Sequence, residues 1–337
     1  MLPIHAHKNG LGQAATDSRL FRISCTIFRN LLRALGICSS GVHAASMEKI
    51  AELADLIDRH TETDGNFDTA LPRVGIIRSS ARTEPIHTLY EPSLCIVAQG
   101  RKRAVIGEIA HVYDAAHYLV VGVDLPVIGA VVEASANRPY LCLRLQLDRG
   151  TLAEMLPTVK GRLPESPAAG VSATTPELIE AAVRLLRLLD TPEDAEVLAP
   201  LIEREILYRL IRGPQGALLR QIANGESRLN QIGRAIDFVR KNFSEPFAIE
   251  HLASVAGMSA SSFYEHFKTV MAMSPLQFRT QLRLQEARRL MVTEGLSAAE
   301  ASFRVGYDSP SQFSRDYVRV HSIPPRRDIE RLRAAAG

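Results

Sequence analysis

Two periods of hydrophobic residues alternate along the chain and divide it into blocks. Residues 47–60 place apolar side chains at helical spacing, whereas residues 71–150 contain short β-rich runs separated by Gly, Pro and Asp. In the clearest run, residues 140–148, leucine alternates with other residues, which is the period of a strand with one buried face. The pattern predicts a small antiparallel barrel or sandwich over about 71–150.

Helical spacing returns at about Pro176 and continues to residue 213. The second of its two segments carries a wide apolar stripe, formed by Leu198, Leu201, Ile202, Ile206, Tyr208 and Leu210. Such a helix pair must pack on the barrel or on a second copy of the chain, and we expect it to contribute to a homodimer interface. Residues 214–228 contain the glycines and polar residues of a linker.

The last third of the chain contains a weak repeat with an offset of 50 residues. Its matching positions are Ser259, Phe263, Phe267 and Pro275 in the first copy and Ser309, Phe313, Tyr317 and Pro325 in the second. Each serine is placed to cap a helix whose aromatic pair faces inward, and a glycine turn at Gly257 or Gly306 precedes it. Helix, glycine turn and capped helix make a helix-turn-helix unit, although a plain αα-hairpin repeat has the same pattern.

The segment between the two units favours a role in DNA binding. Residues 275–293 can form one helix roughly 28 Å long at the standard rise per residue. This length is close to one turn of DNA, about 34 Å, so one chain can place two recognition helices in successive major grooves.

The net charge of +3 is unevenly distributed. It is +4 in residues 1–46, −6 in residues 47–227 and +5 in residues 228–337. A basic last third behind an acidic middle suggests a module that binds a polyanion, although a solvated basic face gives the same count. The sequence has no uncharged apolar stretch of about 18 residues, so no membrane span is expected.

The cysteines and the first residues bear on the compartment. The four cysteines lack a C-x-x-C pair, which favours a reducing cytoplasm over a disulfide framework or a cysteine zinc site. Cys95 and Cys142 fall in predicted strands, where inert core thiols are commoner than sensors. Arginines interrupt the apolar letters before residue 40, so a secretory signal is not expected. We expect Met47 to be the biological start and residues 1–46 to be a disordered extension, with a mobile basic tail as the alternative.

In its last third the chain resembles the AraC/XylS family of bacterial transcription regulators. The similarity is carried by MSASSFYEHFKTVMAMSPLQF, by GYDSPSQFSRDYVRVHSIPPR and by Arg283 and Ala287 between them, and it covers about 229–333. Ala272 and Ser322 stand where the family usually has glycine, and neither position demonstrably needs positive φ. A looser similarity over about 70–215 links the strand-rich region to the cupin-like sensing barrel of one branch of this family.

The resemblance implies roles for individual residues. The base-reading candidates are Ser261, Ser262, Tyr264 and Glu265 in the first unit and Ser311, Gln312 and Arg315 in the second. Arg315 can make a bidentate contact to guanine and Gln312 one to adenine. The phosphate-contacting candidates are Lys268, Arg279, Arg283 and Arg326, each of which could equally be a solvated surface charge.

The fold class that follows is α+β, with an N-terminal small antiparallel cupin-like β-barrel flanked by helices and a C-terminal all-α tandem helix-turn-helix domain. The expected divisions are an extension (1–46), a sensing and dimerisation domain (47–213, helices about 174–213), a linker (214–228) and a DNA-binding domain (229–337). The two helix-turn-helix units are expected at about 248–269 and 297–319.

The function that follows is sequence-specific transcriptional regulation in the cytoplasm, in response to a small-molecule effector. The expected partners are double-stranded DNA, a second copy of the chain and, as a further candidate, RNA polymerase. Neither catalysis nor a cofactor is expected, because no phosphate loop or Ser/His/Asp arrangement stands out and His87, His111 and His117 lack the spacing of a cupin metal site. The alternative is a cupin-type small-molecule-binding protein or enzyme with a helical appendage that does not bind DNA.

Overall fold

A computed structural model describes residues 40–107, 109–156 and 167–336 of the chain. The chain divides into two compact units, residues 1–47 and 48–337. The extension expected at residues 1–46 lies, as far as residue 39, outside the described residues. The helical period found from Met47 belongs to helix α2 (Ser40–Arg59), which begins earlier, at Ser40.

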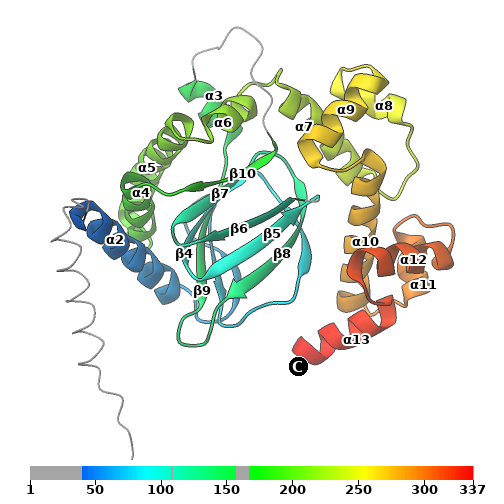
Figure 1. Ribbon diagram of the computed structural model, residues 1–337, viewed down its shortest axis with the longest axis horizontal. Helices are drawn as coiled ribbons and strands as arrows, with labels where there is room; N and C mark the ends of the chain where they lie inside the picture. The colour runs from blue at the N-terminus through cyan, green and yellow to red at the C-terminus, as the bar shows by residue number, and fades with distance from the viewer. Residues whose placement is uncertain (1–39, 108, 157–166, 337) are drawn as a thin grey trace, which may run out of the picture. The chain divides into compact units, whose positions relative to one another are not determined.

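Strands of the described region form two antiparallel sheets (Figure 1). The six-stranded sheet has the order β1-β2-β9-β4-β7-β10 and the four-stranded sheet the order β3-β8-β5-β6. Their bounds are β1 Gly65–Asp68, β2 Val74–Ser79, β3 Ile86–Tyr90, β4 Ser93–Gln99, β5 Arg101–Ile106, β6 Ile109–Asp114, β7 His117–Val121, β8 Leu125–Glu133, β9 Tyr140–Gln146 and β10 Ala169–Ala173. This arrangement confirms the antiparallel β-rich domain.

Strand β9 shows how the alternating sequence is used. Leu141, Leu143 and Leu145 are buried on one face, as the period predicts. Tyr140 and Cys142, on the other face, are buried as well, because the four-stranded sheet lies opposite them. The strand therefore has two covered faces in its first half, where the sequence suggested only one.

Four helices connect the barrel with the last third of the chain. They are α3 Arg149–Met155, α4 Pro176–Arg187, α5 Pro192–Arg212 and α6 Gly216–Ala223. Helices α4 and α5 pack side by side (Figure 1). Helix α6 lies where a linker was expected, at 214–228, and the reason is apolar: Leu218, Leu219 and Ile222 are buried.

The last third of the described chain is helical. Its elements are α7 Arg228–Lys241, α8 Ile249–Ala256, α9 Ala260–Met271, α10 Pro275–Thr293, α11 Ala298–Arg304, α12 Pro310–His321 and α13 Pro325–Ala336. The expected fold class is thereby confirmed: a β-rich domain precedes an all-α domain with two helix-turn-helix units. No helix among the described residues is long and apolar enough to cross a membrane.

A buried carboxylate joins three helices of the second unit. Asp328 on α13 is fully buried and accepts hydrogen bonds from Nε of Arg288 on α10 (2.7 Å) and from the hydroxyl of Tyr317 on α12 (2.8 Å). Burial alone would raise the pKa of Asp328, but the hydrogen bonds from Arg288 and Tyr317 outweigh it and hold the pKa below its ordinary value. The ionised carboxylate is therefore the form that the fold requires.

We expect Asp328→Asn to lower the free energy of unfolding by about 3 kcal/mol at pH 7, because Arg288 would lose its charged partner while it stays largely buried. The folded pKa lies below the unfolded one, so this stabilisation is present above the unfolded value, about 4, and is lost as the pH falls through the folded value. Urea unfolding at neutral and acidic pH should show the difference between wild type and variant shrinking in acid.

The matched control is Glu330→Gln on the same helix, α13. Glu330 pairs with Arg326 at 3.0 Å, but both side chains are well exposed. Exposed ion pairs contribute little to stability, so this variant should have the same free energy of unfolding as wild type. Equal losses for the two variants would contradict the structural role of Asp328.

Candidate functional site

The first helix-turn-helix unit consists of α8 and α9. Gly257 ends α8 with a φ of +69°, and the hydroxyl oxygen of Ser259 accepts a hydrogen bond from the backbone N–H of Ser262 at the start of α9 (3.4 Å). Phe263 and Phe267, one helical turn apart, are fully buried. These contacts fix which face of α9 is presented to solvent.

The second unit, α11 and α12, repeats this plan with one difference. Gly306 adopts a φ of +86°, and a Cβ there would lie 2.0 Å from the carbonyl oxygen of Ser244, so glycine is required. Ser309 occupies the N-cap position of α12, but its side chain makes no capping hydrogen bond, and the predicted serine cap is wrong here. Pro310 begins the helix instead, because its fixed φ suits the first helical turn.

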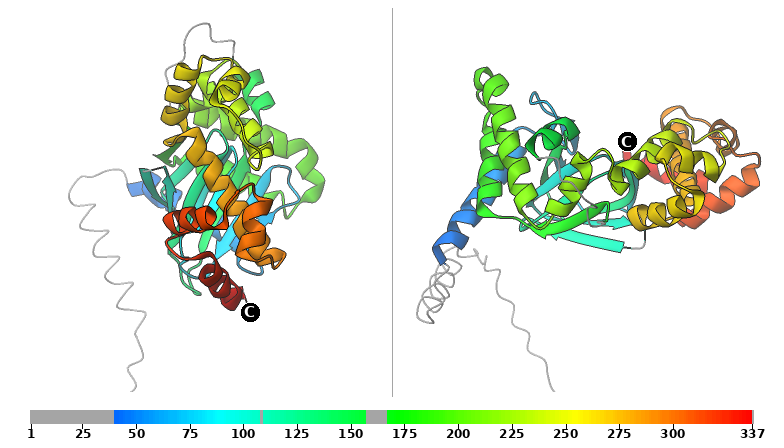
Figure 2. Two further views of the ribbon diagram at one scale, coloured as in Figure 1. Left: turned by 90° about the vertical axis from the view of Figure 1, so that its right-hand side faces the viewer. Right: turned by 90° about the horizontal axis from the view of Figure 1, so that it is seen from above.

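Helix α10 connects the two units and runs from Pro275 to Thr293, as the sequence predicts. A capping box of Ser274 and Gln277 begins it. Figure 2 shows it as one continuous helix between the α8–α9 pair and the α11–α12 pair. The rise per residue gives it a length of roughly 28 Å, somewhat less than one turn of DNA, about 34 Å.

The predicted base-reading residues lie on the outer faces of α9 and α12. Exposed side chains are those of Ser261, Tyr264 and Glu265 on α9 and of Ser311, Gln312 and Arg315 on α12. Ser262 is only half-exposed, and its N–H is used by the Ser259 cap. The first unit therefore presents an acidic and aromatic face, whereas the second presents a cation and an amide.

The four phosphate candidates fall into two groups. Lys268 and Arg326 are exposed and can meet a polyanion. Arg279 lies over the ring of Phe247, 4.8 Å from its centroid, and is half-buried. Arg283 donates to the carbonyl oxygens of Phe243 (2.6 Å) and Ser244 (2.9 Å).

Arg283 is thus engaged inside the domain. Burial, and secondarily the charge of Arg279, lowers its pKa below the ordinary value. Its guanidinium holds α10 against the segment between α7 and α8, and we favour this structural role over contact with phosphate.

Sequence reasoning missed exposed cations in and after the second unit. Arg304 on α11, Arg319 on α12 and Arg327 on α13 are all exposed. Their charges contribute to the basic count of the last third, but only the helix faces show that they point outward. Together with the exposed Arg315 and Arg326, they add positive charge to the surface of this part of the chain.

The two positions that lack the family glycine both adopt left-handed backbone. Ala272 has a φ of +54° and Ser322 a φ of +59°, and each follows the last residue of a recognition helix. The interpretation that neither position needs positive φ is therefore wrong. Each side chain carries a steric cost that glycine would avoid.

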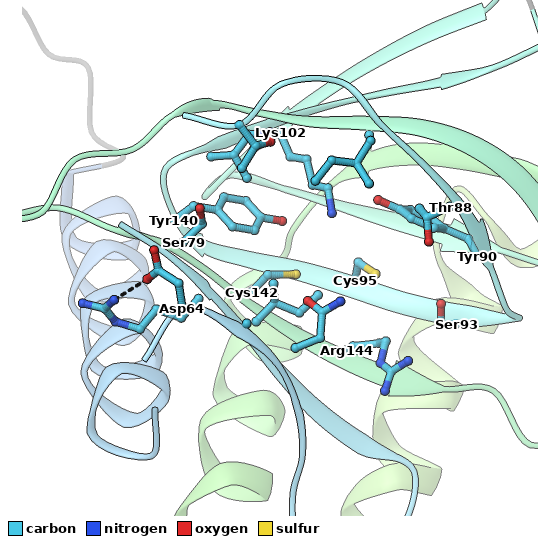
Figure 3. Close-up of a pocket in the computed structure, with 18 of the residues that line it drawn as sticks. Asp64, Ser79, Thr88, Tyr90, Ser93, Cys95, Lys102, Tyr140, Cys142 and Arg144 are labelled. Carbon is cyan, nitrogen blue, oxygen red and sulfur yellow. Dashed lines mark hydrogen bonds and ion pairs between the residues drawn. The ribbon is translucent and has the colours of Figure 1, made fainter. Parts of the chain in front are cut away.

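A cavity of about 620 Å³ lies between the two sheets of the barrel (Figure 3). The six-stranded sheet contributes Ile77, Ser79, Tyr140, Cys142 and Arg144, and the four-stranded sheet contributes Thr88, Tyr90, Lys102, Tyr113 and Val131. Its size lies within the range of small-molecule sites.

Lys102 is one of the charged residues that line this cavity. Its Nζ lies 5.3 Å from the centroid of the Tyr90 ring and 5.8 Å from that of Tyr140. Burial acts to lower the pKa of Lys102, but its interactions with Tyr90 and the two cysteines raise it above the ordinary value. The side chain is therefore an ammonium ion at neutral pH.

Cys95 and Cys142 line the same cavity, and their sulfur atoms lie side by side in Figure 3. Both are free thiols and both are buried. A hydrogen bond from Cys142, aided by Lys102, holds the pKa of Cys95 below its ordinary value. These thiols belong to the buried core, as expected, and they also line the cavity, which the strand pattern could not reveal.

The three barrel histidines do not come together. His87 packs against His321, with ring centroids 4.3 Å apart, and His117 contacts Asp114 at 2.8 Å. Burial lowers the pKa of His87 to about 4, so its imidazole is neutral at pH 7. Within the described ranges, no group of three or more His, Cys, Asp or Glu side chains is placed to hold a metal ion.

Two family models match the chain in the order of its two domains. One, described as the AraC-type transcriptional regulator N-terminus, matches residues 70–218, and a helix-turn-helix domain model matches residues 252–331. The first match covers most of the barrel and helices α3 to α5, and the second covers most of both helix-turn-helix units.

Individual proteins are similar over shorter or more distant stretches. The RCS-specific HTH-type transcriptional activator RclR of Escherichia coli is 33% identical over 134 residues, 40% of this chain and 41% of RclR. The HTH-type transcriptional regulator ExsA of Pseudomonas aeruginosa is 27% identical over 169 residues, 48% of this chain and 59% of ExsA. The chain thus spans about half the length of these curated relatives. The structure of fatty-acid-bound ToxT from Vibrio cholerae matches 79% of this chain and 97% of its own, with a TM-score of 0.50 and 10% identity, and so shares the fold.

Replacement of Ser322, which has left-handed backbone dihedrals, should stabilise the second unit. We expect Ser322→Gly to raise the free energy of unfolding by about 0.5–1 kcal/mol, because glycine adopts positive φ without the steric cost of a Cβ. The control Ser314→Gly, inside α12, should act in the opposite direction by a similar amount. Chemical denaturation of both variants measures this, and a loss of stability in Ser322→Gly would contradict the argument.

Proposed function

Because this chain belongs to the AraC/XylS family of transcriptional regulators, we propose that it is a sequence-specific DNA-binding regulator. The observation that supports this most strongly is the pair of helix-turn-helix units joined by α10, with the predicted reading residues on the outer faces of α9 and α12. The face of α12 lies in the unit that carries exposed arginines, and α9 carries the exposed Lys268, which favours a polyanion as the partner. A cupin enzyme with a helical appendage gives no reason for this placement.

The two recognition helices have different roles in this proposal. Arg315 is a planar donor fork that can read guanine, and Gln312 can read adenine. Glu265 on α9 is an acceptor, which repels phosphate and can read only a cytosine amino group. We assign base reading mainly to α12, and phosphate contact to Lys268 and Arg326.

The barrel supplies the regulatory input. Its cavity is large enough for a small-molecule effector, and a ligand bound between the two sheets can change the state of the protein that binds DNA. RclR is a transcriptional activator, which supports activation of transcription rather than repression for this chain. The partner of the DNA-bound protein is then RNA polymerase.

A homodimer completes the proposal. The apolar stripe predicted on α5 divides in two: Ile202, Ile206 and Leu210 are buried in the chain, whereas Leu201 and Tyr208 are 59% and 56% exposed. Val197 and Leu198 extend the exposed part. An exposed apolar face of this kind on one helix is a self-complementary surface for a second copy.

The reading role of Arg315 is tested by DNA binding at several salt concentrations. Arg315→Ala should weaken binding to the cognate operator by about 1–3 kcal/mol and relax specificity at one base pair, with a much smaller effect on scrambled DNA. Arg315→Lys is the matched control, since it keeps the charge but loses the bidentate fork. It should bind scrambled DNA as tightly as wild type does, but it should not regain wild-type affinity for the cognate operator. Equal losses on both DNAs for the alanine variant would show that Arg315 contacts phosphate.

Glu265 gives the complementary test of the first unit. Glu265→Arg should tighten binding to scrambled DNA and steepen the salt dependence, because one more cation displaces counterions. An unchanged salt slope would show that α9 lies away from the backbone. Failure of wild-type protein to form any salt-sensitive complex with DNA flanking its own gene would refute the proposed function.

The dimer is tested at Leu201. Leu201→Glu should convert dimers into monomers without loss of helix content, because this side chain is exposed in the single chain. Val112→Glu, which changes an exposed valine of β6, is the control and should remain dimeric. Light scattering at micromolar concentration gives the mass, and a monomeric wild type would count against the interface.

A further inference from the structure

The strand period explains why one of three consecutive cations enters the barrel cavity. Arg101, Lys102 and Arg103 begin β5, and successive side chains of a strand point to opposite faces. Arg101 and Arg103 are exposed, whereas Lys102 lies directly across from Tyr113 on β6 and Val131 on β8, both of which line the cavity. The inward position of Lys102 is therefore set by the register of the sheet.

The ammonium has no carboxylate partner among the described residues that line the cavity. Asp64 is bound to Arg78 and Ser80, and Glu91 contacts the side-chain amide of Gln146. The neighbours of Lys102 are instead aromatic rings. Removing an ammonium ion from water is costly, and ring faces offset only part of that cost.

Two hydroxyl groups beside Lys102 lack partners as well. The Tyr90 and Tyr140 oxygens are buried and have no hydrogen-bond partner, and the Tyr140 side chain is completely buried. Figure 3 shows Tyr140 on one side of the cavity and Tyr90 on the other, with Lys102 above the thiols. Buried polar groups are rarely left unsatisfied, so an ammonium and two unpaired hydroxyls around one space indicate a missing acceptor.

The remaining wall residues indicate the polarity and the charge of the ligand. Ile77, Ile86, Leu89 and Val131 provide apolar surface around the polar groups. Two arginines also line the cavity, but each is paired with carboxylates: Arg78 with Asp58 and Asp64, and Arg144 with Asp68. Among the described lining residues, the Lys102 ammonium is therefore the cation left to balance a ligand, and it balances one negative charge. The match is therefore a monoanion with an apolar body.

We propose that the barrel binds a compact organic carboxylate with an aryl or short alkyl body, whose carboxylate accepts hydrogen bonds from Lys102 and from the Tyr90 and Tyr140 hydroxyls. The proposal rests on the proposed function only in treating this ligand as the effector. The binding itself involves barrel residues alone and is measured without DNA.

The test uses benzoate, 3-phenylpropionate and hexanoate, each compared with its uncharged amide. Calorimetry and thermal unfolding of the full chain should show that at least one carboxylate binds and raises the unfolding temperature, whereas its amide binds at least about tenfold more weakly. Failure of all three carboxylates to bind at about 1 mM would overturn the proposal, as would equal binding of acid and amide.

Lys102→Met locates the interaction. This variant should lose at least about tenfold in carboxylate affinity, while the ligand-free protein unfolds at the same or a higher temperature, because a half-buried charge without a carboxylate partner in the cavity is removed. Arg103→Met, one residue along the same strand but on the exposed face, should bind as wild type does. Unchanged affinity in Lys102→Met, or equal losses in both variants, would overturn the assignment.

A second variant keeps the test decisive if Lys102→Met does not fold. Tyr140→Phe retains the buried ring and deletes the unpaired hydroxyl, and it should bind the carboxylate severalfold more weakly. Wild-type affinity in this variant would contradict the proposed contact. DNA binding is scored separately: protein that binds DNA but none of the carboxylates refutes this inference, and protein that binds a carboxylate but no DNA refutes only the proposed function.

Discussion

Helix α10 is the constraint on which the DNA-binding half depends, because both helix-turn-helix units pack on it. Phe278 packs against Phe267 of the first unit, whereas Leu284, Ala287, Leu290 and Met291 belong to the hydrophobic core of the second. Between them, Arg283 binds two backbone carbonyls and so satisfies acceptors that the loop before α8 leaves open. A continuous helix that is packed at both ends resists bending, and the spacing of the two recognition helices follows from its length rather than from a flexible joint.

The barrel meets a different requirement, that of a cavity inside a small β structure. Sheets that pack face to face normally fill the space between them with side chains. Here Gly129 and small residues such as Ser79, Ser93 and the two cysteines leave that space open, while Tyr140 and Tyr113 stay buried at its edge. The unpaired Tyr90 and Tyr140 hydroxyls destabilise the fold, and the carboxylate that we propose would offset this cost by accepting hydrogen bonds from them. The same features that reduce stability therefore favour ligand binding.

Much of this organisation could be predicted from sequence, and the exceptions have physical causes. Aromatic pairs four residues apart and glycine turns are local signals, so both helix-turn-helix units and the bounds of α10 were recognisable. Positive φ at Ala272 and Ser322 was not, because it is imposed by how the chain leaves each helix rather than by the residue. Helix α6 was hidden by its glycines and polar neighbours. The roles of Arg283, Cys142 and Lys102 depend on contacts between distant segments, which no local pattern encodes.

The charges on the two recognition helices lead to one more conclusion. Helix α9 presents Glu265 before Lys268, whereas α12 presents Arg315 and Arg319, the latter paired with Asp316 at 2.9 Å. Phosphate attraction acts over about a Debye length, so on the proposed function we expect α12 and its neighbouring cations to dominate the approach to DNA. The rigid α10 then sets the position of α9 relative to the next major groove. If α9 and that groove do not coincide, the DNA must bend, the packing of α10 must change or α9 must lose contacts. On the proposal that the chain binds DNA, the second unit supplies most of the affinity and of the base reading, and the first unit, which presents Glu265, contributes less to both.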